Sequence, residues 1–367
     1  MNQSFEISFF GASLLSSYWN GAATYYRGIV RALHGLGHRI TFYEPDAYGR
    51  QQHRDMEPPE WAKVHVYNAE GTGGVYEALE LARNSGLIVK ASGVGVHDEL
   101  LEREVLNAGT SGTVVAFWDV DAPVTLDRLD RDPSDPFHAL VPRYDIIFTY
   151  GGGDPVVQAY KRFGARNCAP IYNALDPATH FPVKPDPSFA ADLSFLGNRL
   201  PDREARVWEF FVGAAKSLPD KTFLLGGNGW DGQAMPANVR CAGHVSTNHH
   251  NAFNSSAPAV LNISRDSMAR YGFSPATRVF EAAGAAACII TDSWEGIEMF
   301  FEPEKEIIVA KSGTEVAARL AALTEHQSRS IGLAARKRAL AAHTYASRAI
   351  HVDSILSGRF VAAGRSM

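Results

Sequence analysis

The chain alternates short apolar runs with amphipathic stretches from its first residues onward. Apolar runs of four to eight residues bounded by turn residues are typical of buried strands, and apolar positions three and four apart are typical of helices that face a core. In the first half, the expected strands cover 5–10, 40–43, 65–68, 87–92, 113–119 and 145–150. Helical patterns lie between them, among others at 22–36, 76–84 and 98–107. The alternation predicts a parallel sheet with helices on both faces.

A proline-rich segment, NALDPATHFPVKPDPS at 173–188, interrupts this rhythm and is typical of a linker. Beyond it the expected strands are 192–197, 222–227, 257–264, 288–292 and 306–310, with helices at 202–217 and from 274, and a long helical tail at 314–356. We therefore expect an α/β protein of two doubly wound, Rossmann-like domains. The predicted ranges are 1–175 for the N-terminal domain, 176–188 for the linker, 189–345 for the C-terminal domain and 346–367 for a last helix. Ligands of such sheets bind at the carboxyl ends of the strands, so a cleft between the domains is the expected site.

Composition narrows the functional classes. The 367 residues fit two domains, and the chain is 46% hydrophobic and 20% charged, with no apolar run long enough to span a bilayer and no basic leader. These features predict a cytoplasmic globular protein. A net charge of −5 argues against general nucleic-acid binding. The cysteines Cys168, Cys241 and Cys288 have neither disulfide nor metal-ligand spacing, and we expect buried, reduced thiols.

The segment GFSPATRVFEAAGAAACIITD, 272–292, predicts a helix that runs into an apolar strand. Ser274 is a good N-cap and Pro275 suits the first helical position, so free N–H groups after them would attract a phosphate. One face of the helix carries Thr277, Arg278, Glu281 and Gly284. The carboxylate of Glu281 can accept two hydrogen bonds from a ribose diol. The alternative is a solvated ion pair between Arg278 and Glu281.

Further candidates follow the expected strands of this domain. They are Gly197, Asn198, Arg199 and Arg203 after one strand, Gly227 and Asn228 after the next, and Arg265 after a third. Guanidinium groups can neutralise a pyrophosphate, and glycines allow close backbone approach to a ligand. Each candidate also has a purely structural alternative. Arg203 would lie on a solvated helix face with neighbouring glutamates, the glycines would belong to an ordinary glycine-rich strand end, and Arg265 would be a surface arginine.

The segment 272–310, GFSPATRVFEAAGAAACIITDSWEGIEMFFEPEKEIIVA, resembles the donor-binding segment of GT-B glycosyltransferases, most closely those related to the spore maturation protein CgeB. The resemblance lies in a Ser-Pro and Arg-x-x-Glu helix, a strand ending in Asp, a Gly-x-Glu turn and a Phe-rich loop. Five further segments match the same group in order: 13–46, 117–126, 145–153, 172–183 and 192–204. The resemblance covers most of residues 5–356. It depends on all these segments occurring in the same order, because no single motif would suffice.

This resemblance implies a GT-B fold, with two Rossmann-like domains facing across a cleft and the last helix crossing back to the N-terminal domain. The C-terminal domain would bind a nucleotide-sugar donor and the N-terminal domain most of the acceptor. Glu281 would hold the ribose, and Arg278, with the N–H groups after Ser274, would face the diphosphate or the sugar and support catalysis. Many retaining members have a second glutamate eight residues upstream, where this chain has Phe273, so inversion or retention stays open.

In the N-terminal domain, the loop 16–24 contains Asn20 and Gly21, which either contact phosphate or acceptor or form a plain turn. Asp119 and Asp121 have the spacing of a metal-binding pair, but GT-B enzymes usually neutralise the leaving group with helix ends and basic side chains, so we expect no metal. Asp121 is instead a candidate general base or acceptor contact, or a helix N-cap. The histidines show no ligand spacing, and we expect solvated or core roles for them.

The resulting hypothesis is a metal-independent, hexosyltransferase-like enzyme without a cofactor. It would move a sugar from a UDP-sugar to a glycan, protein or small-molecule acceptor. We expect a monomer or homodimer that binds no nucleic acid and contacts a membrane at most peripherally. Two alternatives remain: a nucleotide-sugar epimerase of the same fold, and a non-catalytic nucleotide-binding assembly protein. A dinucleotide oxidoreductase is disfavoured, because GASLLSSYWNG and not G-x-G-x-x-G follows the first strand.

Overall fold

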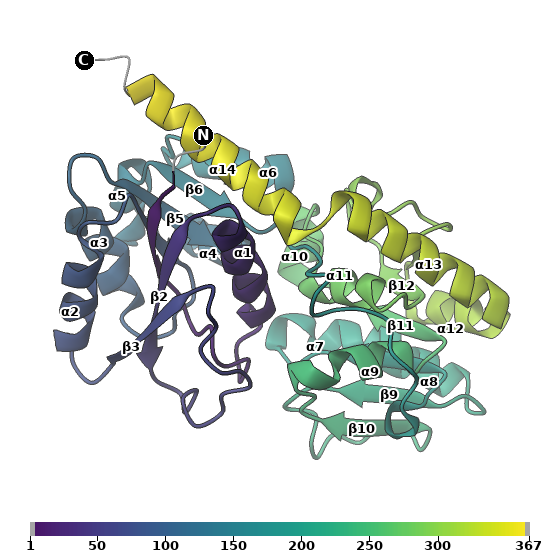
Figure 1. The fold of residues 1–367 in the computed structure, drawn as a ribbon. Coiled ribbons are helices and arrows are strands. Elements are labelled where there is room, and N and C mark those ends of the chain that lie inside the picture. Colours follow the sequence, from purple (N-terminus) through teal and green to yellow (C-terminus); the bar gives the residue numbers. More distant parts are fainter. Residues whose placement is uncertain (1–3, 364–367) are drawn as a thin grey trace. The chain divides into compact units, whose positions relative to one another are not determined.

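The computed structural model of the chain describes residues 4–363. Two compact units form, each a parallel sheet covered by helices (Figure 1). Unit 1 holds the chain up to Tyr172 and again from Tyr345, and unit 2 holds Asn173–Thr344. Within residues 4–363, no helix is both long and apolar enough to cross a membrane.

Unit 1 has a seven-stranded sheet in the order β3-β2-β1-β4-β5-β6-β7, with every neighbouring pair parallel. The strands are β1 Glu6–Phe10, β2 Arg39–Asp46, β3 Lys63–Asn68, β4 Leu87–Ala91, β5 Val114–Asp119, β6 Ile146–Thr149 and β7 Cys168–Pro170. The helices are α1 Ala23–Gly35, α2 Gly73–Ala82, α3 Asp98–Ala108, α4 Ala122–Arg131, α5 Phe137–Leu140, α6 Gly153–Arg162 and α14 Tyr345–Ala363. The strand order reverses between β1 and β4, which is where open α/β sheets leave a crevice for ligands.

Helix α14 comes from the far end of the sequence and packs on α1. Gly28 of α1 lies against the ring of Tyr345, and a Cβ at this glycine would stand 2.1 Å from Tyr345 Cδ2. Farther along α14, Asp353 Oδ1 lies 3.4 Å from Nε2 of His38, a histidine that is 1% exposed. Helix α14 therefore completes the core of unit 1.

Unit 2 has a six-stranded sheet in the order β10-β9-β8-β11-β12-β13, again parallel throughout. The strands are β8 Leu193–Leu196, β9 Phe223–Gly226, β10 Val239–Gly243, β11 Ala259–Asn262, β12 Ile289–Asp292 and β13 Ile308–Ala310. The helices are α7 Pro201–Val207, α8 Gly213–Ser217, α9 His250–Ser255, α10 Asp266–Tyr271, α11 Thr277–Gly284, α12 Gly313–Ala322 and α13 Glu325–Ala342, and a π-helical turn, Trp208–Val212, joins α7 to α8.

The segment 176–188, predicted as a linker, lies within unit 2. Its backbone N–H groups are bonded along α9: Phe181 N donates to Asn251 Oδ1 at 3.2 Å and Asp186 N donates to Ser256 Oγ at 2.8 Å. Asn251 of α9 and Ser256, its C-cap residue, thus accept hydrogen bonds from backbone N–H groups of this proline-rich stretch.

The expected helical tail at 314–356 is present as three helices, because Thr324 caps α13 through a capping box with Gln327 and the chain turns again at His343 and Thr344. One local prediction is wrong. Cys241 is exposed because it lies on the edge strand β10, whereas Cys288 is buried and Cys168 is partly buried.

Candidate functional site

Helix α11 carries the residues that the sequence singled out, but it begins at Thr277 and not at Ser274. Gly272 and Phe273 have positive φ angles of 69° and 46°, and the Ser274 hydroxyl closes this turn by donating to Gly272 O at 2.8 Å. The predicted N-cap is therefore wrong. Asn173 holds the true start of the helix: its Nδ2 donates to Pro275 O at 2.9 Å, and its Oδ1 accepts from Thr277 Oγ1 at 2.9 Å.

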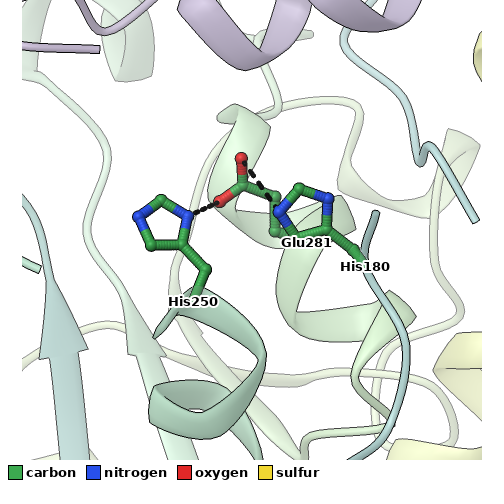
Figure 2. A group of neighbouring side chains, drawn as sticks. All are labelled: His180, His250 and Glu281. Carbon is green, nitrogen blue, oxygen red and sulfur yellow. Dashed lines mark ion pairs between the residues drawn. The ribbon is translucent and has the colours of Figure 1, made fainter. Parts of the chain in front are cut away.

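Glu281 lies in the second turn of α11 and is 6% exposed, so a solvated pair with Arg278 does not describe it. Its carboxylate faces two histidines from separate segments (Figure 2). His180 Nε2 is 3.8 Å from Oε1, and His250 Nδ1, at the start of α9, is 3.4 Å from Oε2. Burial lowers the pKa of the His180 imidazole, although Glu281 acts in the opposite direction. This histidine is thereby favoured in its neutral form.

Gly284 allows this arrangement one turn further along α11. A Cβ at this position would stand 2.4 Å from Leu175 Cδ1 and 2.8 Å from His180 O. The glycine therefore lets the segment before His180 lie directly on the helix that carries Glu281.

Two arginines converge at the carboxyl end of β8. The guanidinium groups of Arg278 and Arg203 lie over the Phe195 ring, 5.2 and 5.7 Å from its centroid. Arg278 donates to Leu196 O and, at 3.1 Å, to Asn262 Oδ1, and Arg203 donates to Asn198 O.

Gly197 lies between these two cations, since a Cβ there would be 2.9 Å from Nη2 of each arginine. Burial lowers the pKa of the Arg278 guanidinium to about 10. The pKa of Arg203 is lowered well below its usual range by burial first and then by the charges of Arg278 and Arg265. Arg203 is 7% exposed, so the alternative of a solvated helix face is wrong. Two desolvated cations side by side favour an anion between them.

The other predicted arginines of unit 2 already have carboxylate partners on α7. Arg265 Nε is 3.0 Å from Asp202 Oδ2, and Arg199 Nη2 is 2.7 Å from Glu204 Oε1. These contacts fix both side chains and offset their charge.

The predicted glycine-rich turn after β9 packs on the turn after β8. Asn228 N donates to Asn198 Oδ1 at 2.9 Å. Gly227 has a φ of 123°, and a Cβ there would be 2.3 Å from Gly197 O. Glycine is thus required for the two turns to meet beside the arginines.

The predicted residues of unit 1 are Asn20, Gly21 and Asp121. Asn20 Nδ2 donates to Ser13 O and Ser16 O at 2.8 and 3.0 Å, so this side chain holds its own loop together. Gly21 has a negative φ and open space where a Cβ would be, so the backbone does not demand glycine there.

Asp119 is fully buried and Asp121 is not. Asp119 Oδ1 accepts from Ser92 Oγ at 2.7 Å and from Asp121 N at 2.9 Å, and Oδ2 accepts from the Tyr160 hydroxyl. These bonds make Asp119 a structural carboxylate at the end of β5. Asp121 occupies the N-cap position of α4 without a capping bond from its side chain to the helix.

Sequence reasoning missed His180, His250, Asn173 and Asn262 as parts of the site. The first two were expected in solvated or core roles, and the asparagines carried no motif. Position was the available signal: Asn262 ends an apolar strand, as the predicted candidates do, and His250 opens a helix of the same domain.

Residues 203–354 match the family described as "Glycosyl transferase-like". Comparison with curated proteins gives no sequence match.

Several solved structures are similar over nearly the whole chain. The sucrose-phosphate synthase from Thermosynechococcus elongatus is 13% identical, with 98% of this chain and 100% of that chain covered and a TM-score of 0.70. Anabaena HepE in complex with UDP-glucose is 12% identical, with 96% and 100% covered and a TM-score of 0.67. An α-glucosyltransferase in complex with UDP and a 13-mer DNA is 12% identical, with 97% and 100% covered and a TM-score of 0.67. At such identities the likeness establishes the fold: two Rossmann-like α/β domains of the GT-B class.

Proposed function

We propose that this chain is a GT-B glycosyltransferase that transfers a sugar from a UDP-sugar to an acceptor. The observation that carries the proposal is the pairing, on one helix, of the buried carboxylate of Glu281 with the guanidinium of Arg278, which meets Arg203 beside Gly197. The shared fold and the match of residues 203–354 support it. The finer placement close to the CgeB-related group is part of the same proposal.

In the proposed complex, Glu281 accepts hydrogen bonds from both hydroxyls of the ribose. Arg278 is one helical turn earlier, a rise of about 4.5 Å along the axis, which suits a diphosphate attached to that ribose. Two of the five N–H donors of Arg278 hold Leu196 O and Asn262 Oδ1, and its remaining donors face the anion.

Catalysis in this proposal depends on stabilising the negative charge of the leaving group. As the bond between the sugar and the diphosphate breaks, negative charge grows on the leaving phosphate oxygen. Arg278 and Arg203 are already desolvated and held in place, so they stabilise that charge without reorganising. In this proposal the arginines take the part that a divalent metal has in other transferases. Asp121 of unit 1 is proposed as the general base or the contact of the acceptor hydroxyl.

The test is calorimetric titration of UDP, GDP, dTDP and their sugars into the wild type and Glu281→Gln. Hydrogen bonds to a charged group contribute about 1.5–3 kcal/mol each, so losing the charge should weaken UDP binding by about tenfold or more. Glu325→Gln, which changes an exposed glutamate at the start of α13 in the same unit, is the control and should bind as the wild type does. Equal UDP affinity in Glu281→Gln would refute the assignment.

Product analysis separates the remaining alternatives. The donor alone should yield at most slow hydrolysis, whereas an epimerised donor would identify an epimerase. UDP binding without transfer to any acceptor in a broad panel would indicate a non-catalytic protein.

A further inference from the structure

Three potential metal ligands converge beside α11, and they come from three separate segments. His180 follows β7, His250 opens α9 and Glu281 lies on α11, and their side chains point toward one another (Figure 2). The candidate ligand atoms all lie within 4.8 Å of one another. In the part of the chain that the structure describes, this is the one group of three His, Cys, Asp or Glu side chains with that property.

The three side chains are close enough to share one ion, and their separations are too long for direct hydrogen bonds. Zinc binds histidine nitrogen and carboxylate oxygen at about 2.0–2.2 Å, so neighbouring ligand atoms of a tetrahedral site are about 3.3–3.5 Å apart. The separations here are 3.4 Å for His250 Nδ1 to Glu281 Oε2 and 3.8 Å for His180 Nε2 to Glu281 Oε1, so each histidine faces a different carboxylate oxygen and small side-chain rotations bring one oxygen and both nitrogens onto a single ion. Both separations exceed the usual 2.7–3.2 Å of an N–H···O bond.

Two further observations on the histidines favour a bound ion. Within the described residues, the Nδ1 atom of His250 is buried and makes no hydrogen bond. On His180, the ring nitrogen that faces away from Glu281 lies 2.9 Å from Thr179 Oγ1. Metal-binding histidines characteristically bond a second oxygen in this way, which fixes the ring orientation.

We propose that His180 Nε2, His250 Nδ1 and Glu281 bind a zinc ion, with water at the fourth position. Two imidazoles and one carboxylate form a ligand set that zinc accepts in proteins. Because Glu281 also holds the ribose in the proposed function, on which this second part rests, zinc and the nucleotide compete for one carboxylate. Zinc then inhibits donor binding and has no part in the transfer.

The experiment uses tag-free protein, freed of metal with a chelator that is then removed, and titrates zinc chloride into it by calorimetry. One zinc per chain is expected, and His250→Gln should weaken binding by about tenfold or more. His249→Ala is the matched control, since His249 is the exposed neighbour whose Nδ1 faces Ser246 and not Glu281. Equal zinc affinity in the wild type and His250→Gln would overturn the proposal, as would no binding at all.

Cobalt(II) gives a second readout that does not depend on stability. The visible bands of tetrahedral cobalt should appear with the wild type and with His249→Ala, and be lost in His250→Gln that retains the wild-type circular dichroism. Bands that persist in His250→Gln would place the ion elsewhere.

UDP titrations with and without zinc separate the two proposals. A UDP affinity that zinc lowers in the wild type but not in His250→Gln supports competition, because zinc held by the free diphosphate affects both proteins alike. An equal effect of zinc on both proteins refutes it. If UDP binding depends on Glu281 in metal-free protein but zinc does not bind, the zinc site fails alone. If zinc binds and Glu281→Gln still binds UDP normally, the proposed function fails and the zinc site stands.

Discussion

Gly332→Ala should destabilise unit 2, although the change places a better helix former inside a helix. Gly332 lies within α13, and a Cβ there would stand 2.0 Å from Ala286 O, 2.8 Å from Ala286 C and 3.0 Å from Ala287 C. The obstacle is the backbone of the turn after α11, so no side-chain rotation relieves it. Cβ contacts below 3.0 Å essentially never occur, so the helix and the turn must separate by at least 3.0 − 2.0 = 1.0 Å.

The two effects have opposite signs and different sizes. Alanine stabilises a helix interior by about 1 kcal/mol relative to glycine. Overpacking a rigid core costs about 1–3 kcal/mol, and a backbone obstacle favours the upper end. The net loss should be about 2 kcal/mol. For a unit of 172 residues, 173 to 344, this lowers the melting temperature by about 4–8 °C.

Differential scanning calorimetry, checked by urea unfolding, measures the change. The control is Gly213→Ala in the same unit, because a Cβ at Gly213 meets only Trp208 O at an ordinary 3.7 Å. The control should keep or slightly raise the melting temperature. If Gly332→Ala melts at or above the wild-type temperature, helix propensity outweighs the contact and the packing argument is refuted.

Three further predictions concern thiols, pH and charge. Burial raises the pKa of the Cys288 thiol to about 12, whereas Cys241 is exposed, so a disulfide reagent should label Cys241 first; a fast phase that survives Cys241→Ser would contradict this. Burial lowers the pKa of His38, whose Nδ1 accepts a hydrogen bond from Phe5 N. Below about pH 6.5 the unfolded chain therefore binds more protons than the folded chain, and the free energy of unfolding should decrease as the pH is lowered. His38→Gln should flatten that dependence in urea titrations from pH 7 to pH 5, and an unchanged slope would argue against it. Arg278→Met should weaken UDP binding by about tenfold or more, since a charged hydrogen-bond donor is lost; calorimetry showing wild-type affinity would remove this residue from the site.

The α/β class was predictable because most strands of both sheets are buried and read as continuous apolar runs, which only a sheet covered on both faces produces. The edge strands β7 and β10 escaped prediction because both are partly exposed and neither reads as a continuous apolar run. The start of α11 was mispredicted for another reason. Ser-Pro is a good local start signal, but Phe273 N donates to Glu295 O, far away in sequence, and this contact holds the turn that delays the helix.

The candidate site was predictable only in part, for a similar reason. Glu281 and Arg278 stood out because they share one helix face, a relation that spacing reveals. The contacts of Glu281 with His180 and His250 join distant segments, and no local pattern encodes them. Arg203 looked like a member of a charged surface helix, yet the structure buries it over Phe195.

The packing of Tyr345 against Gly28 affects the order in which the two units fold during synthesis. Unit 2 is one continuous stretch and can finish folding as soon as it leaves the ribosome, whereas unit 1 waits for its last helix. At about 5–20 residues per second, the 172 residues between Tyr172 and Tyr345 delay that helix by roughly 9–34 s. Throughout this interval Tyr345 does not cover α1 at Gly28. Nascent chains therefore expose an apolar face of unit 1, the unit that is synthesised first.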